Sequence, residues 1–195
     1  NGQGLNRAEA NNNLHYVTRV SYPFRLKSGR FIEPGFAAYT GATTVSSDIR
    51  TAGVRGLTNF ADKRIIGSLV VYPQPLGFQA EYNIGKGPQY NPQTNTIETR
   101  HLFGGYAQTM YMKKYNGQVF IPFARFQYYN GGKRLETDGR HYLVRDLEFG
   151  LEWQKNSFFE VVGEYMKSDR TFEDAANRNN RQQGGLFRLQ VQLSY

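Results

Sequence analysis

The strongest constraint in this sequence is the strict alternation of apolar and polar side chains over its last nine residues. The odd positions are all apolar: Phe187, Leu189, Val191, Leu193 and Tyr195. The even positions are all polar: Arg188, Gln190, Gln192 and Ser194. A period of two puts the two sets on opposite faces of a β-strand. A tilted strand of about ten residues also has the length needed to cross a bilayer. The segment therefore predicts a membrane-crossing strand.

The same alternation recurs upstream and predicts an all-β, antiparallel protein. The segments that fit are 14–22, 31–40, 64–72, 78–85, 101–112, 122–128, 146–154, 158–167 and 187–195, which makes about nine strands. The facing of 31–40, 64–72, 101–112 and 158–167 stays open, because both sets of positions carry apolar residues. An aromatic share of 15% and 21 glycines agree with short strands joined by turns.

The connections between these segments fall into two kinds that alternate along the chain. Short ones follow Tyr22, Tyr72, Lys114 and Gln154, and the third contains Asn116-Gly117, which suits a type I′ turn. Longer polar ones cover 41–63, 85–100, 130–144 and 168–184. Transmembrane β-barrels of the outer membrane have short periplasmic turns and longer extracellular loops. The sequence therefore predicts such a barrel over residues 14–195.

The strand count has a topological consequence. An odd number of strands cannot close an up-and-down barrel with every pair antiparallel. If the last strand ends in the periplasm, the first strand starts outside the cell, and residues 1–13 are the remnant of an extracellular loop. We therefore expect the chain to be the C-terminal portion of a larger barrel. The alternative is that one strand has been miscounted.

The face opposite the apolar stripes is charged, which decides between a membrane barrel and a soluble one. Its charged members are Arg19, Glu81, Arg125, Glu148, Glu152, Glu160, Glu164 and Arg188. In the core of a small soluble barrel, each unpaired charge would cost several kcal/mol of desolvation. In a water-filled lumen the same charges cost little. The pattern therefore favours a transmembrane pore over a soluble β-barrel or sandwich.

Catalytic and cofactor signatures are absent from the sequence. There is no cysteine, and His15, His101 and His141 are far apart without metal-ligand spacing. No nucleophile or phosphate-loop motif occurs, so we predict no enzyme, no metal and no cofactor. The net charge of +8 is spread among acidic residues, without the basic run typical of nucleic-acid binding.

Three segments resemble one known family, the phosphate-selective porin O and P family. They are IPFARFQYYNGGKR (121–134), LEFGLEWQKNSFFEVVGEYMKSDR (147–170) and GLFRLQVQLSY (185–195). The resemblance implies the C-terminal half of a 16-stranded, homotrimeric porin in the outer membrane of a Gram-negative bacterium. It also implies passive uptake of small anions such as phosphate. In outer-membrane proteins generally, a terminal aromatic residue, here Tyr195, resembles the signal read by the barrel-assembly machinery.

The residues suggest a mechanism for anion preference. Arg19, Arg125 and Arg188 would project into the lumen and raise the local anion concentration, because a low-dielectric wall focuses the field of fixed charges. The acidic set Glu81, Glu148, Glu152, Glu160 and Glu164 would make the adjacent wall negative and give a transverse field. The expected surroundings are the lipid bilayer and lipopolysaccharide. The alternatives are a non-specific diffusion porin, a barrel scaffold or sheath for an envelope partner, and an outer-membrane enzyme.

Overall fold

The computed structural model describes residues 13–45, 59–132, 139–174, 176, 178 and 180–194, and its regular structure there is entirely β. The strands are β1 (Tyr16–Ser21), β2 (Phe24–Arg25), β3 (Phe31–Thr44), β4 (Asn59–Val71), β5 (Leu76–Asn91), β6 (Thr96–Tyr111), β7 (Lys113–Tyr115), β8 (Gln118–Gly132), β9 (His141–Asn156), β10 (Phe159–Glu173) and β11 (Asn180–Leu193). No helix in this part of the chain is long and apolar enough to span a membrane. The predicted all-β class is confirmed.

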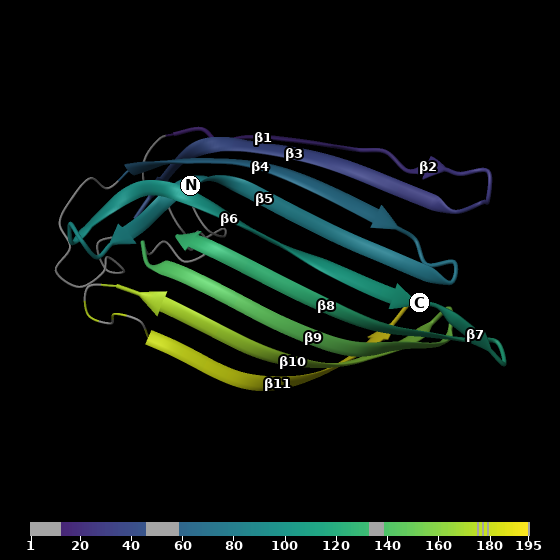
Figure 1. Cartoon of the computed structure of the whole chain (residues 1–195). Helices are drawn as coiled ribbons and strands as arrows, with labels where there is room; N and C mark the ends of the chain where they lie inside the picture. Colours follow the sequence, from purple (N-terminus) through teal and green to yellow (C-terminus); the bar gives the residue numbers. More distant parts are fainter. Residues whose placement is uncertain are drawn as a thin grey trace.

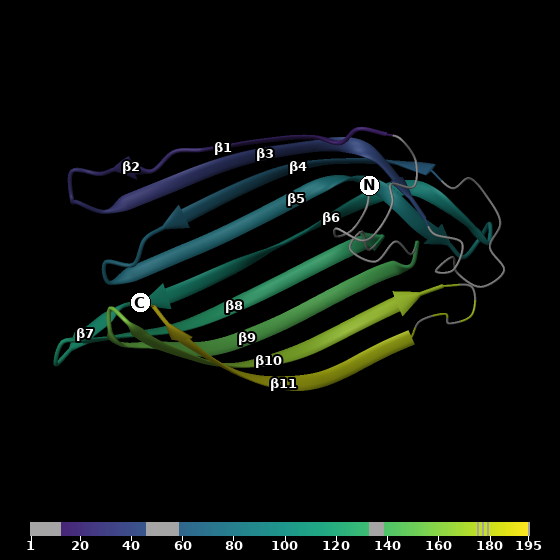
Figure 2. The same ribbon diagram turned by 180° about the vertical axis from the view of Figure 1, so that it is seen from behind.

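All eleven strands belong to one antiparallel sheet in the order β1-β3-β4-β5-β6-β8-β9-β10-β11. β2 pairs with β3 beyond the end of β1, and β7 pairs with β8 beyond the end of β6. The sheet therefore has nine positions across, and each predicted strand segment falls on one of them. Figures 1 and 2 show the sheet curled, with β1 at one edge and β11 at the other. These edges do not pair with each other, so the sheet is open.

The register separates the side chains into two faces. Gln79, Gln108, Arg125 and Glu148 are directly opposite one another on β5, β6, β8 and β9, so they share the side called here the charged face. The residues that alternate with them, such as Phe126, lie on the other side, called here the apolar face. Because the pairing is continuous from β3 to β11, this register also assigns the faces that the sequence left open.

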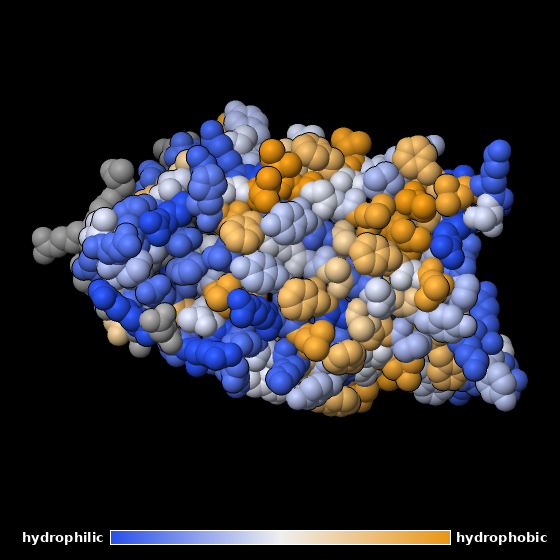
Figure 3. Space-filling model, viewed as in Figure 1, coloured by the Kyte–Doolittle hydropathy of each residue, from blue (hydrophilic) through white to orange (hydrophobic). Residues whose placement is uncertain are grey.

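Burial on the two faces is the reverse of that in a soluble protein. Large apolar side chains on the apolar face are exposed, at 53% for Phe149 and 69% for Phe187. On the charged face, the side chain of Asp62 is fully buried. Figure 3 shows apolar residues gathered toward the short turns and hydrophilic residues at the end that carries the longer connections, called here the long-loop end. Such a surface is stable only where lipid or another apolar partner covers it.

The turns confirm one prediction and correct another. Asn116 and Gly117 have φ of 49° and 74°, as a type I′ turn requires. The predicted loop over 85–100 is wrong, because β5 and β6 stay paired as far as Asn91 and Thr96 and leave a turn over 92–95. Side-chain hydrogen bonds brace this polar hairpin, where the carboxylate of Glu98 accepts from Asn91 at 2.9 Å. Its lack of an apolar stripe made it resemble a loop, so short and long connections do not alternate strictly.

Candidate pore wall

The middle of the charged face holds Arg125 against an aromatic ring. The guanidinium carbon of Arg125 lies 4.1 Å from the centroid of the Tyr106 ring on β6. The Tyr106 hydroxyl accepts a hydrogen bond from Gln79 Nε2 at 2.7 Å, which fixes the ring from β5. Within the described residues, Arg125 forms no ion pair, and its Nε has no hydrogen-bond partner. A cation–π contact of this kind contributes about 0.5–2 kcal/mol and leaves guanidinium donors available.

Arg188 occupies a different environment on the last strand. Its Nη1 lies 2.9 Å from Glu164 Oε1 on β10, directly opposite in the register. On β9, Glu148 is directly opposite Arg125 of β8. Two residues further along β9, Gly150 is directly opposite Glu164 of β10, so Glu148 and Glu164 lie on neighbouring strands, offset by two residues. The four charged residues, two arginines and two glutamates, therefore gather on adjacent strands β8–β11. They are called here the central cluster.

The remaining predicted site residues share the charged face but lie apart from the central cluster. Glu152 and Glu160 lie toward the short turns, where Gln154 donates to Glu152 Oε1 and is opposite Glu160. Glu81, on β5, is opposite Tyr106 of β6. Arg19 is on the edge strand β1, opposite Ala37, and lies five strand positions from Arg125 and eight from Arg188 in the sheet. Tyr195 lies outside the described residues.

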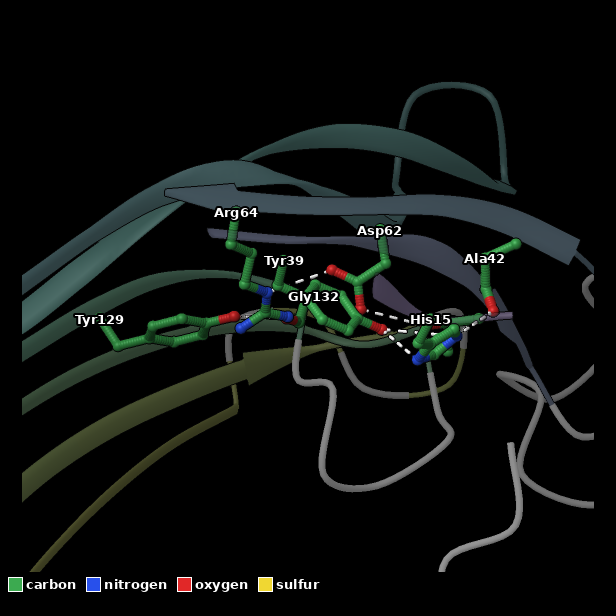
Figure 4. Close-up of polar contacts among 8 residues, drawn as sticks. His15, Tyr39, Ala42, Asp62, Arg64, Tyr129 and Gly132 are labelled. Carbon is green, nitrogen blue, oxygen red and sulfur yellow. Dashed lines mark hydrogen bonds and ion pairs between the residues drawn. The ribbon is translucent and has the colours of Figure 1, made fainter. Parts of the chain in front are cut away.

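A second polar group, at the long-loop end, escaped the sequence analysis. Arg64 Nε lies 3.1 Å from Asp62 Oδ1, and Thr43 Oγ1 donates to Asp62 Oδ2 at 3.0 Å. Figure 4 shows this pair, both from β4, beside Tyr39 of β3 and Tyr129 of β8. Asp62 and Thr43 were missed because the segment 41–63 was predicted to be a loop, and Arg64 because the facing of 64–72 stayed open. The alternation Asp62, Arg64 on one face of β4 was the signal that could have revealed them.

The long-loop end also pairs charges between β9 and β10. Asp146 Oδ2 lies 2.8 Å from Arg170 Nη2, and Asp146 Oδ1 accepts from Ser168 Oγ at 2.6 Å. Together with Asp62 and Arg64, this pair is called here the long-loop cluster. Both acids are almost completely buried. In this cluster each arginine is matched to a carboxylate, as expected where charges are withdrawn from water.

The charged face is suited to act on ions through its fixed charges more than through a defined binding site. No group of three or more His, Cys, Asp or Glu side chains in the described ranges is placed to hold a metal ion. What the face presents is a strip of guanidinium and carboxylate groups of which Arg125 lacks a carboxylate partner among the described residues. Such a strip attracts or repels small ions according to local sign, without binding them in a closed pocket.

An antiparallel sheet with an exposed apolar face and a charged opposite face is typical of the class of transmembrane β-barrel proteins. Comparison with known families finds a match to phosphate-selective porin O and P over residues 2–195. The chain therefore belongs to that family, and the match extends beyond the segments in which the resemblance was recognised. No curated protein and no solved structure matches the chain.

Proposed function

We propose that this chain forms part of the wall of a water-filled outer-membrane pore that favours small anions such as phosphate. The charged face lines the water and the apolar face contacts lipid. The proposal is supported by family membership and by the inverted burial of the two faces. Small solutes would cross by diffusion, so no covalent step and no cofactor is needed.

Closure into a barrel is part of the proposal. Strands β1 and β11 leave one side of their backbones unpaired in this sheet, and such edges are not stable in lipid. The first and last of nine alternating positions run in the same direction, so they do not close with each other in antiparallel fashion. Further strands would complete the wall of a barrel that has sixteen strands in total. Three such barrels would associate as a trimer.

The single observation that carries the anion preference is the state of Arg125. Its charge is held over Tyr106 without a carboxylate within ion-pair distance among the described residues. Arginine keeps its charge at any relevant pH, and its planar fork matches two oxygens of a phosphate. A half-buried cation on a low-dielectric wall therefore offers an anion both attraction and directed hydrogen bonds.

The test is the reversal potential across a planar bilayer that separates two concentrations of potassium chloride. We expect the native protein to be anion-selective, and we expect selectivity to fall in Arg125→Gln/Arg188→Gln. A matched control is Arg145→Gln/Lys167→Gln, which removes two charges from the apolar face. Cation selectivity of the native protein that the central substitutions leave unchanged would sink the proposal.

The acidic residues favour a second candidate, a diffusion porin with little selectivity. Glu148 and Glu164 adjoin the two arginines, and Glu152 and Glu160 extend the negative wall toward the short turns. If their field balances that of the arginines, the reversal potential stays near zero and phosphate does not reduce the chloride current. The same bilayer experiment separates the two candidates.

A further inference from the structure

The apolar face carries one feature that a pore wall does not require, a row of basic side chains in register on β4, β5 and β6. Lys63 is directly opposite Lys86, and Lys86 is directly opposite His101. All three side chains are exposed. Directly opposed side chains on one face have Cβ atoms about 4.5–5.5 Å apart, and like charges there are destabilising. The two ammonium groups therefore repel each other unless an anion lies between them.

No protein carboxylate meets this need within the described residues. Neither lysine forms an ion pair there, and Thr40 continues the row on β3. The other half of the apolar face differs, because Arg181 Nη2 lies 2.6 Å from Asp169 Oδ2 between β10 and β11. The second half thus has an acid of its own, Asp169, beside its basic side chains, whereas the described part of the first half has no acid on this face.

An apolar groove adjoins the row of basic residues, which form part of its lining. It has a volume of about 700 Å³, and Tyr16, Ile65 and Ile84 line it together with the two lysines. Ile65 and Ile84 are each about half exposed although they are aliphatic. The groove is therefore basic where Lys63 and Lys86 line it and apolar where Ile65 and Ile84 line it.

A second hollow lies next along β4, nearer the middle of the apolar face. This hollow has a volume of about 550 Å³ and includes Gly67, Leu69 and Ala80. Ile65, Gly67 and Leu69 are successive same-face positions of β4, so the two hollows follow one track along the strand. Gly67 lies between Phe36 and Tyr82 in the register, and a Cβ built on it meets nothing within 4 Å. The track is open because a glycine separates two aromatic side chains.

We infer that this track binds one lipid whose headgroup carries a phosphate, with the phosphate on Lys63, Lys86 and His101 and an acyl chain along Ile65 and Gly67. Charge complementarity selects the headgroup, because two unpaired ammonium groups and an imidazole can donate hydrogen bonds to phosphate oxygens. The apolar floor selects an acyl chain over a free anion. This inference rests on the proposed contact of the apolar face with lipid, but not on the anion preference of the pore.

The test uses the protein in neutral detergent micelles, with lipid adducts counted by native mass spectrometry. The probe is dioleoyl phosphatidic acid, and the reference is dioleoylglycerol, which has the same chains without phosphate. We expect phosphatidic acid to bind more tightly than dioleoylglycerol. Lys63→Gln/Lys86→Gln should weaken its binding about twenty-fivefold, since each basic residue at a membrane surface contributes about fivefold.

Two further variants separate the headgroup from the chain. Arg145→Gln/Lys167→Gln removes the same charge from the half that contains Asp169 and should leave binding of phosphatidic acid unchanged. Gly67→Leu fills the open hollow and should weaken binding of phosphatidic acid and dioleoylglycerol alike. A Cβ at position 67 meets nothing within 4 Å, and the remaining side chain extends over the exposed apolar face, so folding should be preserved.

Three results would overturn the inference. They are equal binding of the two lipids, an equal loss in both lysine and control doubles, and complete displacement of phosphatidic acid by millimolar inorganic phosphate. The reversal potential of Lys63→Gln/Lys86→Gln is measured in parallel and should equal that of the native protein. A change there would count against the assignment of faces in the proposed pore, which makes the two failures distinguishable.

Discussion

Arg64 of the long-loop cluster and Arg125 of the central cluster lie on the same face of the same sheet, yet their surroundings differ. At the long-loop end, Arg64 lies 3.1 Å from the fully buried Asp62, and Thr43 donates to the same carboxylate. In the centre, Arg125 rests on Tyr106 without a carboxylate within ion-pair distance among the described residues. This difference supports the proposal that Arg64 stabilises the fold, whereas Arg125 acts on a solute.

This contrast follows from the way burial changes the free energy of a charge. Removing one partner of a buried pair leaves an uncompensated charge and costs about 3–5 kcal/mol. A charge that faces water keeps most of its hydration, so its removal changes the local potential more than it changes stability. The two clusters should therefore respond to substitution in different measurements.

The largest expected effect is on stability, from Asp62→Ala. The substitution leaves Arg64 buried without its carboxylate and removes the acceptor of the Thr43 hydroxyl. We expect the free energy of unfolding to fall by about 3 kcal/mol, measured by urea titration of the protein in lipid vesicles. The control is Asp62→Leu/Arg64→Met, which removes both charges and should lose less. A larger loss in the double variant would contradict the role given to this pair.

The next effect is on ion selectivity, from Arg125→Gln. One elementary charge about 4 Å from a passing ion contributes about 1 kcal/mol in water-like surroundings, which is about a fivefold change in the ratio of chloride to potassium permeability. The free energy of unfolding should change by less than it does for Asp62→Ala. Lys167→Gln is the matched control, because it removes one cation from the apolar face. Equal shifts in the two variants would break the distinction between the faces.

A smaller effect is expected when the charge is kept and only the guanidinium shape is lost. Arg125→Lys retains the cation but not the two-pronged geometry that matches phosphate oxygens. We expect the phosphate concentration that halves the chloride current to rise about threefold, with chloride selectivity retained. Arg188→Lys should change the block less, since Arg188 already donates to Glu164. The reverse order would show that Arg188 is the arginine that contacts phosphate.

The smallest effect concerns the ring beneath Arg125. Tyr106→Leu removes the cation–π contact, which contributes about 0.5 kcal/mol at the low end of its range, and this is about twofold in phosphate affinity. Tyr106→Phe keeps the ring and loses only the hydrogen bond from Gln79. It should therefore stay close to the native protein in the same current-block titration. Equal losses in both variants would mean that the hydroxyl matters more than the ring.

The sequence predicted the strand positions well because alternation acts over a few residues. Each of the nine predicted segments lies on its own position in the sheet, and the Asn116-Gly117 turn is of the predicted type. The strand ends beyond the apolar stripe were not predictable in this way, because the hairpin between Asn91 and Thr96 is held by backbone pairing and polar side chains. A period of two gives no information where both faces are polar.

For the candidate site, the sequence predicted only the side of the sheet on which its residues lie. Alternation assigned Arg125 and Arg188 to the same side of their strands, and the register places them there. It could not give the partners, because Tyr106 and Glu164 contact the arginines across strands rather than along the chain. The role of these residues in the pore remains a prediction for the experiments above.

The measurement that tests the central claim most directly is the reactivity of single cysteines introduced on the two faces. The chain has no cysteine of its own, so each introduced thiol is the only target in it. Gln108→Cys and Gln127→Cys lie on the charged face, whereas Ala107→Cys and Phe126→Cys lie on the apolar face. We predict that a charged, membrane-impermeant thiosulfonate labels the first two in lipid vesicles and reduces their ion current, but leaves the other two unlabelled. Labelling of Ala107→Cys and Phe126→Cys at an equal or higher rate would contradict the assignment of the charged face to water.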